Sequence, residues 1–212
     1  MRRWGAPAMI ALAALARAEI VDRIAVIAGN QVITQSEIRR EIRLTAFLNG
    51  EQPDFSPAAR RKAADRLIEQ KLIRRELELS RYPLPEVTAI QPTWKELLRE
   101  RSWSERELEG ELAKAGLSRP DLERRLLWQH TLLRFIEVRF LPGVHVSEEE
   151  VRESFEASRA GHAAGNVRLS FEQVREEIER TLRDRQVDRE LDQWLKDARG
   201  RTRVEIRPEA FE

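Results

Sequence analysis

The chain has 212 residues, of which 41% are hydrophobic, and this is enough apolar material to bury the core of one domain or of two small ones. It carries 38 Lys and Arg residues against 37 Asp and Glu residues, and both charges are interspersed along nearly every segment. This composition excludes an intrinsically disordered chain and lacks the clustered basic residues of a nucleic-acid-binding surface. The chain contains no cysteine, which suits an oxidising compartment.

Residues 1–18, MRRWGAPAMIALAALARA, have the features of a secretory signal peptide. Two arginines precede an apolar run over residues 5–16, and Ala16 and Ala18 form an A-x-A cleavage site. We therefore expect cleavage before Glu19 and export of the mature protein. The alternative is an uncleaved membrane anchor, but the apolar run is shorter than the ~20 residues needed to span a bilayer. The sequence predicts no stable membrane insertion.

The mature chain is predicted to begin with a β-hairpin, because apolar residues alternate along residues 24–28 and Gly29-Asn30 then turns the chain into residues 31–33. The alternation places Ile24, Val26 and Ala28 on one face and Ala25 and Ile27 on the other. A lone hairpin is marginal in water. Residues 203–207 form the only other predicted strand, so we expect this strand to pair with the open edge of the hairpin and close a three-stranded sheet.

The rest of the chain is predicted to be helical, at residues 35–49, 57–81, 93–101, 105–115, 119–141, 148–160 and 171–199. Five helix starts carry a Ser or Thr followed three residues later by Glu, Asp or Gln, the capping-box pattern: Thr34 with Glu37, Ser104 with Glu107, Ser118 with Asp121, Ser147 with Glu150, and Ser170 with Gln173. The expected fold class is therefore mainly α, with a small sheet formed by an N-terminal hairpin and a C-terminal strand.

The predicted helix 119–141 is apolar on two sides, which is typical of a helix at the centre of a core. One stripe contains Leu122, Leu126, Leu133, Ile136 and Phe140, and the other contains Trp128, Leu132 and Phe135.

In this order, the segments VDRIAVIAGNQVITQSEI, RLIEQKLIRREL, SERELEGELAKAGLS and RFLPGVHVSEEEVRESFEA resemble the N-terminal chaperone module of the SurA family of periplasmic folding factors. The ending SFEQVREEIERTLRDRQVDRELDQWLKDARGRTRVEIR is similar to the C-terminal helix and strand of that family. The resemblance covers nearly all of residues 20–207, and the order and spacing of the segments carry it. It implies a periplasmic location and chaperone activity.

The chain departs from the family at one place. Family members usually carry one or two parvulin-type prolyl isomerase domains before the C-terminal helix, whereas here only residues 161–169 separate the two helical parts. An independent domain needs at least ~50 residues, so no isomerase domain fits. The expected organisation is a signal peptide at 1–18, a helical chaperone module at 19–160, a short linker at 161–169, and a C-terminal helix and strand at 170–212 that complete the same module.

No arrangement of residues in the sequence predicts an enzyme or a cofactor. The three histidines, His130, His145 and His162, have no partner at metal-ligand spacing, and His130 lies among leucines and aromatic residues. There is no cysteine nucleophile, no G-x-S-x-G motif and no glycine-rich phosphate loop.

The function implied by the resemblance is that of an ATP-independent holdase, which binds unfolded or nascent exported polypeptides such as outer-membrane β-barrel precursors. Its groove would have apolar walls and a charged rim. The residues predicted to bind clients are aromatic and aliphatic: Trp94, Leu97, Leu98, Trp128 and Phe140. Their alternative role is packing in the core. One other hypothesis is a protein that belongs to the prolyl isomerase family by name only. Another is a non-chaperone periplasmic adaptor with one defined partner. The sequence also allows a homodimer.

Overall fold

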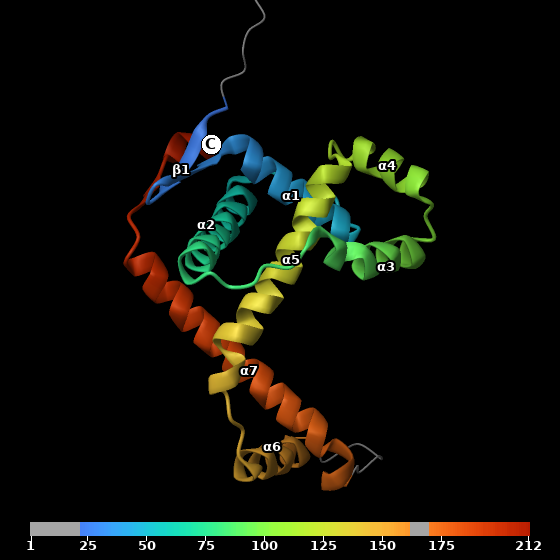
Figure 1. The fold of residues 1–212 in the computed structure, drawn as a ribbon, viewed down its shortest axis with the longest axis vertical. Coiled ribbons are helices and arrows are strands. Elements are labelled where there is room, and N and C mark those ends of the chain that lie inside the picture. Colours follow the sequence, from blue (N-terminus) through green and yellow to red (C-terminus); the bar gives the residue numbers. More distant parts are fainter. Residues whose placement is uncertain (1–21, 162–169) are drawn as a thin grey trace, which may run out of the picture.

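The structure, a computed structural model, describes residues 22–161 and 170–212. The predicted signal peptide and its cleavage site at Ala16, Ala18 and Glu19 therefore lie outside the described residues, as does nearly all of the predicted linker. The described chain is mainly helical with one small antiparallel sheet, which is the fold class that the sequence predicts (Figure 1).

The sheet joins the two ends of the described chain. Strand β1 (Ile24–Ala28) lies between β2 (Gln31–Thr34) and β3 (Val204–Ile206), and both neighbours are antiparallel to it. Val26 pairs with Ile206 and Ala28 with Val204, so the predicted pairing of the C-terminal strand with the hairpin is confirmed. The turn between β1 and β2 uses Gly29 at a φ of +62°, a left-handed conformation that glycine adopts without strain.

The predicted alternation along the first strand is wrong at its start. Ile24 pairs with Thr34 and Val26 pairs with Ile33, so Ala25 is an extra residue in a β-bulge. As a result, Ala25 and Val26 are both fully buried, whereas Ile24 is 45% exposed and does not share a face with Val26.

Seven α-helices occupy the described residues: α1 (Gln35–Asn49), α2 (Pro57–Ser80), α3 (Gln91–Arg101), α4 (Glu105–Lys114), α5 (Arg119–Arg139), α6 (Glu148–Gly161) and α7 (Phe171–Gly200). Three short 3₁₀ helices, which the sequence analysis did not predict, are η1 (Val87–Ile90), η2 (Leu141–Gly143) and η3 (Pro208–Ala210).

All five predicted capping boxes form. In the first of them, the backbone N–H of Thr34 donates to the Glu37 carboxylate at 2.8 Å, and the Thr34 hydroxyl accepts from the Glu37 backbone N–H at 3.3 Å. A cap of this kind stabilises a helix by about 1 kcal/mol because it satisfies backbone N–H groups that have no partner within the helix.

Three hydrophobic clusters hold the helices together, and we call them the sheet core, the α3–α4 core and the α5–α7 core. The sheet core lies between the sheet and helices α1 and α2: Ala25, Val26, Ile33, Ile38, Ile42, Ala63, Ala64, Ile68, Leu72, Ala198, Ala210 and Phe211. The α3–α4 core contains Leu44, Ile90, Trp94, Leu97, Leu108, Leu112, Leu117, Leu122 and Leu126. The α5–α7 core contains Ile73, Leu77, Trp128, Phe135, Phe140, Val144 and Val187.

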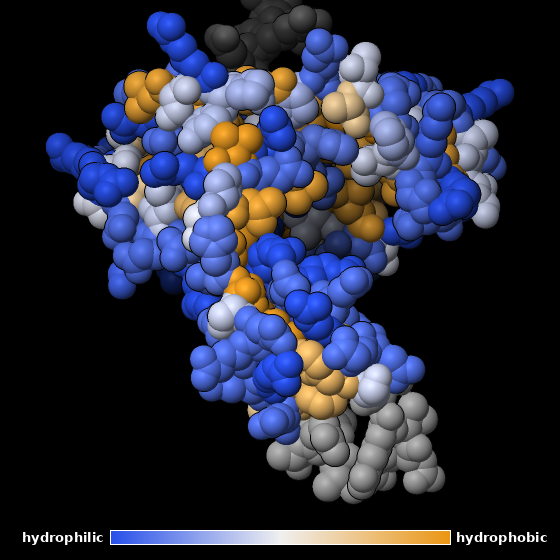
Figure 2. Space-filling model, turned by 60° about the horizontal axis from the view of Figure 1, so that its bottom comes forward, coloured by the Kyte–Doolittle hydropathy of each residue, from blue (hydrophilic) through white to orange (hydrophobic). Residues whose placement is uncertain are grey.

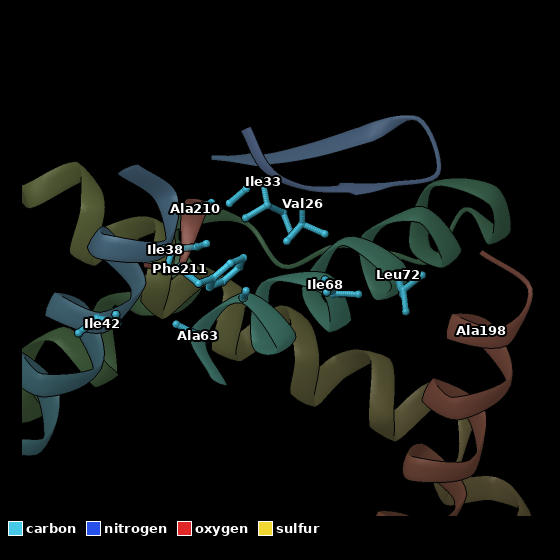
Figure 3. Close-up of a cluster of buried hydrophobic side chains, with 12 residues drawn as sticks. Val26, Ile33, Ile38, Ile42, Ala63, Ile68, Leu72, Ala198, Ala210 and Phe211 are labelled. Atoms are coloured by element: carbon cyan, nitrogen blue, oxygen red, sulfur yellow. The ribbon is translucent and has the colours of Figure 1, made fainter. Parts of the chain in front are cut away.

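The sheet core is completed by the end of the chain. Figure 3 shows Val26 and Ile33 pointing from the sheet towards α2, with Phe211 beside Ile38. Phe211 is 2% exposed, so the segment after β3 returns under the sheet and contributes a full side chain to the core. This contact lies beyond the last predicted element, the strand at residues 203–207, and is not expected from the sequence pattern.

Helix α5 passes from one core to another, as expected for the central helix. Leu122 and Leu126, near its start, belong to the α3–α4 core, and Trp128 and Phe135 belong to the α5–α7 core. One member of the predicted stripes departs from this pattern, because Leu133 is 59% exposed.

A buried carboxylate also connects three helices. Glu41 on α1 is 4% exposed, and it accepts hydrogen bonds from Arg125 on α5 at 2.9 and 3.1 Å and from Arg66 on α2 at 3.1 Å. Helices α1, α2 and α5 are therefore tied together through one charge cluster as well as through apolar contacts.

The α6 helix and the first half of α7 project from the rest of the protein as a pair, which we call the stem (Figure 1). The rings of Phe155 and Phe171 pack edge to face across this pair, with centroids 5.4 Å apart. The second half of α7 continues from the stem to the sheet core, where Ala198 is buried. Within the described residues, every helix is too short or too polar to cross a membrane.

Candidate functional site

The structure buries most of the residues predicted to bind clients. Trp94 is 3% exposed, Leu97 9%, Trp128 6% and Phe140 8%, and Leu98 is half-buried. The expectation that these side chains form an exposed apolar surface is therefore wrong.

Trp94 is buried because α3 packs its apolar face into the α3–α4 core. Its indole N–H donates to the Glu105 carboxylate at 2.9 Å, and the guanidinium of Arg119 lies 4.6 Å from its ring. The side chain thus has both a hydrogen-bond acceptor and a cation over its face, as is usual for a buried tryptophan.

Trp128 and Phe140 are covered by other elements in the α5–α7 core. The guanidinium of Arg74 lies 4.8 Å from the Trp128 ring, and burial at this place lowers the pKa of Arg74. Phe140 packs edge to face against Phe135, with ring centroids 5.5 Å apart. Trp194 of α7 stands edge-on to the same Phe135 ring at 5.2 Å, so α7 helps to close this core.

Other large apolar side chains are exposed. The most exposed lie on α2, on the connection between α2 and α3, and on α5: Leu79 at 71%, Leu84 at 61%, Val87 at 62% and Leu133 at 59%. Smaller exposed areas lie on the sheet and after α5, at Ile24, Val32, Leu141 and Ile206.

The connection between α2 and α3 crosses α5, and two contacts fix where it does so. At its start, the Tyr82 ring packs edge to face on Phe135 with centroids 6.1 Å apart. At its end, the hydroxyl of Thr93 is hydrogen-bonded to Nε2 of His130 at 2.9 Å. The segment between these contacts, which includes η1, therefore runs along α5 past the stretch that contains Leu133.

Three exposed apolar residues belong to the two elements that meet at this crossing. Leu84 and Val87 lie on the connection, within a few residues of its first contact with α5. Leu133 lies one turn after His130 on the same side of α5, since residues three apart are neighbours on a helix surface. We call Leu84, Val87 and Leu133 the crossing patch. Figure 2 shows apolar surface that runs from the body of the protein towards the stem, beside a hollow between the two.

Charged side chains surround the crossing patch. Arg134 and Glu137, next to Leu133 on α5, form an exposed ion pair at 3.0 Å, and Glu86 is exposed between Leu84 and Val87. The patch is thus a small apolar area with a rim of both charges.

Only part of this patch could be predicted from the sequence. Leu133 falls in a stripe that is predicted to be buried, and Val87 lies in a 3₁₀ helix outside the predicted elements. Leu84 did carry a signal, because it stands between Pro83 and Pro85 in a segment that can form neither a helix nor a central strand. An apolar residue in such a segment has few ways to be buried.

The described residues offer little to metal or acid–base chemistry. No three His, Cys, Asp or Glu side chains among them lie close enough together to hold a metal ion. His130 is half-buried and bonded to Thr93, and His145 is exposed, whereas His162 lies outside the described residues.

Comparison with known proteins adds no relative. No family model matches the chain, and no curated protein matches it either.

Proposed function

We propose that the protein is an ATP-independent periplasmic holdase of the SurA type, which binds unfolded exported polypeptides through the crossing patch. The observation that carries the proposal is that Leu84, Val87 and Leu133 are each about three-fifths exposed and belong to the two elements that meet at the crossing, the α2–α3 connection and α5. Exposed apolar side chains grouped inside a polar rim mark sites that bind other proteins.

The size of the patch fits weak and reversible binding. Fully burying a large aliphatic side chain contributes about 1.5–3 kcal/mol, so three of them contribute at most about 4.5–9 kcal/mol. Association and the ordering of the bound chain offset at least ~4 kcal/mol of this. At most about 5 kcal/mol is left, which corresponds to a dissociation constant no tighter than about 0.2 mM for one contact. A client held by such contacts leaves without nucleotide hydrolysis.

The SurA assignment rests on the resemblance of residues 20–207 and on the agreement of the fold class with what that resemblance implies. The proposed clients are outer-membrane β-barrel precursors. The proposal includes no catalytic step, because residues 161–169 leave no room for an isomerase domain of ~50 residues.

The test is suppression of aggregation. A urea-unfolded outer-membrane barrel protein is diluted into buffer with the chaperone at equal concentration, and light scattering is followed. We expect the wild-type protein to suppress the scattering, and a variant with Leu84→Ser, Val87→Ser and Leu133→Ser to lose most of this effect. Val32→Ser, at a residue that is 43% exposed on β2 and away from the crossing, is the matched control and should behave as wild type.

Lack of suppression by the wild-type protein at stoichiometric amounts removes the proposal. A pull-down from periplasmic extract distinguishes the adaptor hypothesis, because a holdase recovers many unrelated proteins and an adaptor recovers one stoichiometric partner.

A further inference from the structure

A cavity of about 530 Å³ lies between the end of α1, the end of α3 and the end of α4. This volume is in the range of ~300–1,000 Å³ that is usual for small-ligand sites. Two of its lining residues, Arg43 and Arg101, come from different helices, and the guanidinium group of each lies close to a glycine that follows a helix.

The two glycines allow the guanidinium groups to approach the helix ends. Gly50, after α1, has a φ of +72°, and a Cβ atom built there would lie 3.0 Å from Nη1 of Arg101. Gly116, after α4, has a φ of +67°, and its Cβ would lie 3.2 Å from Nη1 of Arg43. A side chain at position 50 or 116 would push the neighbouring guanidinium group aside. Both arginines therefore keep their positions only while these two residues are glycines.

Both guanidinium groups keep most of their hydrogen-bonding capacity. Arg101 donates through Nη2 to the Leu48 carbonyl at 2.9 Å, and Arg43 donates through Nη1 to the Gly116 carbonyl at 3.4 Å. A guanidinium has five N–H donors. Within residues 22–161 and 170–212, neither arginine forms an ion pair with a carboxylate, whereas Arg40, Arg66 and Arg125 all do.

The charged side chains that line the cavity have a net charge that one negative charge on a ligand would balance. Lys114 is paired with Glu111 at 2.6 Å, and Glu51 is exposed at the edge. Three basic and two acidic side chains line the cavity, and the difference is one positive charge. A group with a single negative charge fits this balance better than a phosphate dianion.

Beside the arginines the wall is aromatic. The rings of Phe47 and Trp103 are 6.0 Å apart, both are half-buried, and the Arg101 guanidinium lies 5.7 Å from the Trp103 ring. The cavity therefore offers donors for a carboxylate next to a surface for an apolar group. Arginine binds carboxylates with two parallel hydrogen bonds, which makes the pair both strong and directional.

We infer that this cavity binds the C-terminal residue of a polypeptide through its free α-carboxylate and its apolar side chain. A C-terminal apolar residue carries both groups on one Cα, whereas the carboxylates of Asp and Glu side chains have no apolar group beside them. The inference rests on the proposed function, since it takes the ligand to be an unfolded client. Glu212 of this chain is engaged elsewhere, because its main-chain oxygen accepts a hydrogen bond from Arg60 at 2.7 Å.

The test uses the full-length protein and a fluorescein-labelled glycine–serine hexapeptide that ends in phenylalanine. Fluorescence anisotropy is measured for the peptide with a free C-terminal carboxylate and for the same peptide with a C-terminal amide. We expect at least tenfold tighter binding of the free acid. Equal binding of acid and amide by the wild-type protein overturns the inference, whatever any variant does.

Variants locate the site. Arg43→Gln and Arg101→Gln should each remove the preference for the free acid, while far-UV circular dichroism checks that the fold is kept. Arg99→Gln, on the same helix as Arg101 but with a side chain that is 77% exposed, is the matched control and should keep the preference. A preference that survives when both arginines are replaced contradicts the inference.

A third measurement distinguishes a polypeptide ligand of the cavity from a small carboxylic acid ligand. Free 3-phenylpropionate carries a carboxylate and a phenyl group without a peptide chain, and we expect it to compete only at concentrations at least tenfold above the peptide. Competition at equal concentration overturns the assignment to a polypeptide. Failure of the peptide with aggregation still suppressed removes this inference alone, whereas peptide binding without suppression removes the holdase proposal alone.

Discussion

Glu41 connects α1 with α2 and α5 through its hydrogen bonds to Arg66 and Arg125. Its carboxylate is 4% exposed and balances the charges of Arg125 and Arg66, whose side chains are 17% and 31% exposed. Removing one member of a buried charge cluster leaves the others uncompensated, which destabilises a protein by about 3–5 kcal/mol.

We predict that Glu41→Gln lowers the free energy of unfolding by about 3 kcal/mol, near the lower end of that range, because Arg66 keeps some contact with water. Urea unfolding followed by circular dichroism measures this. Glu96→Gln, which removes an exposed ion pair with Arg99 on α3, should change the same quantity by less than about 1 kcal/mol. A similar small change for Glu41→Gln would contradict its role.

Asp121 makes stability depend on acid pH. Burial alone would raise the pKa of its carboxyl group, but hydrogen bonds from the Ser118 hydroxyl and backbone N–H, together with the charges of Arg40 and Arg124, outweigh burial and lower that pKa below 3.8. The pKa is thus lower in the folded state than in the unfolded state. The stabilisation is present in full above the unfolded value and is lost as the pH falls through the folded value.

We predict that the free energy of unfolding falls more steeply between about pH 5 and pH 3 in the wild-type protein than in Asp121→Asn, which has no charge to lose. Urea titrations at a series of pH values compare the two slopes. Parallel slopes would mean that Asp121 does not contribute.

At the scale of elements, the helix boundaries could be predicted because their signals are local. A capping box needs only residues three apart, so the starts of α1, α4 and α5 follow from the sequence without knowledge of the fold. The pairing of β3 could be predicted by elimination, since the hairpin edge was the only predicted strand partner.

The features that sequence could not predict depend on contacts between distant elements. The bulge at Ala25 lies in the pairing of β1 with β2, and there both Ala25 and Val26 are buried in the sheet core. Trp94 contacts Glu105 of α4, and Trp128 contacts Arg74 of α2. An amphipathic pattern predicts which face of a helix is apolar, but it does not predict which other element covers that face. For the same reason, the pattern that places Leu133 in an apolar stripe could not show that no element of the described chain covers it.

The segment after β3 tests how the end of the chain contributes to the fold. We predict that Phe211→Ala lowers the free energy of unfolding by about 3–5 kcal/mol, the usual effect of removing a buried aromatic ring. Urea unfolding measures the change, and Glu209→Ala, at an exposed residue two positions away, is the control. If both variants unfold alike, the tail is not part of the sheet core.

For the whole molecule, the sheet brings the two ends of the described chain together and α7 spans the distance from the stem to that sheet (Figure 1). The sheet core, the stem and the crossing patch are therefore parts of one continuous structure. The crossing patch and the cavity lined by the ends of α1, α3 and α4 lie on different elements, and the two proposals together take a long unfolded chain to contact both. Several weak contacts on one chain raise its overall affinity without a strong single site.

Photocrosslinking to an unfolded client tests the central claim most directly. Leu84 or Val87 is replaced by benzoylphenylalanine, and the protein is irradiated together with a urea-diluted outer-membrane barrel protein. We predict a crosslinked product from both positions, and little or none when the same group replaces Val32 on β2. Crosslinking from position 32 as strong as that from positions 84 and 87, or no product from either of those two, would contradict the assignment of the crossing patch.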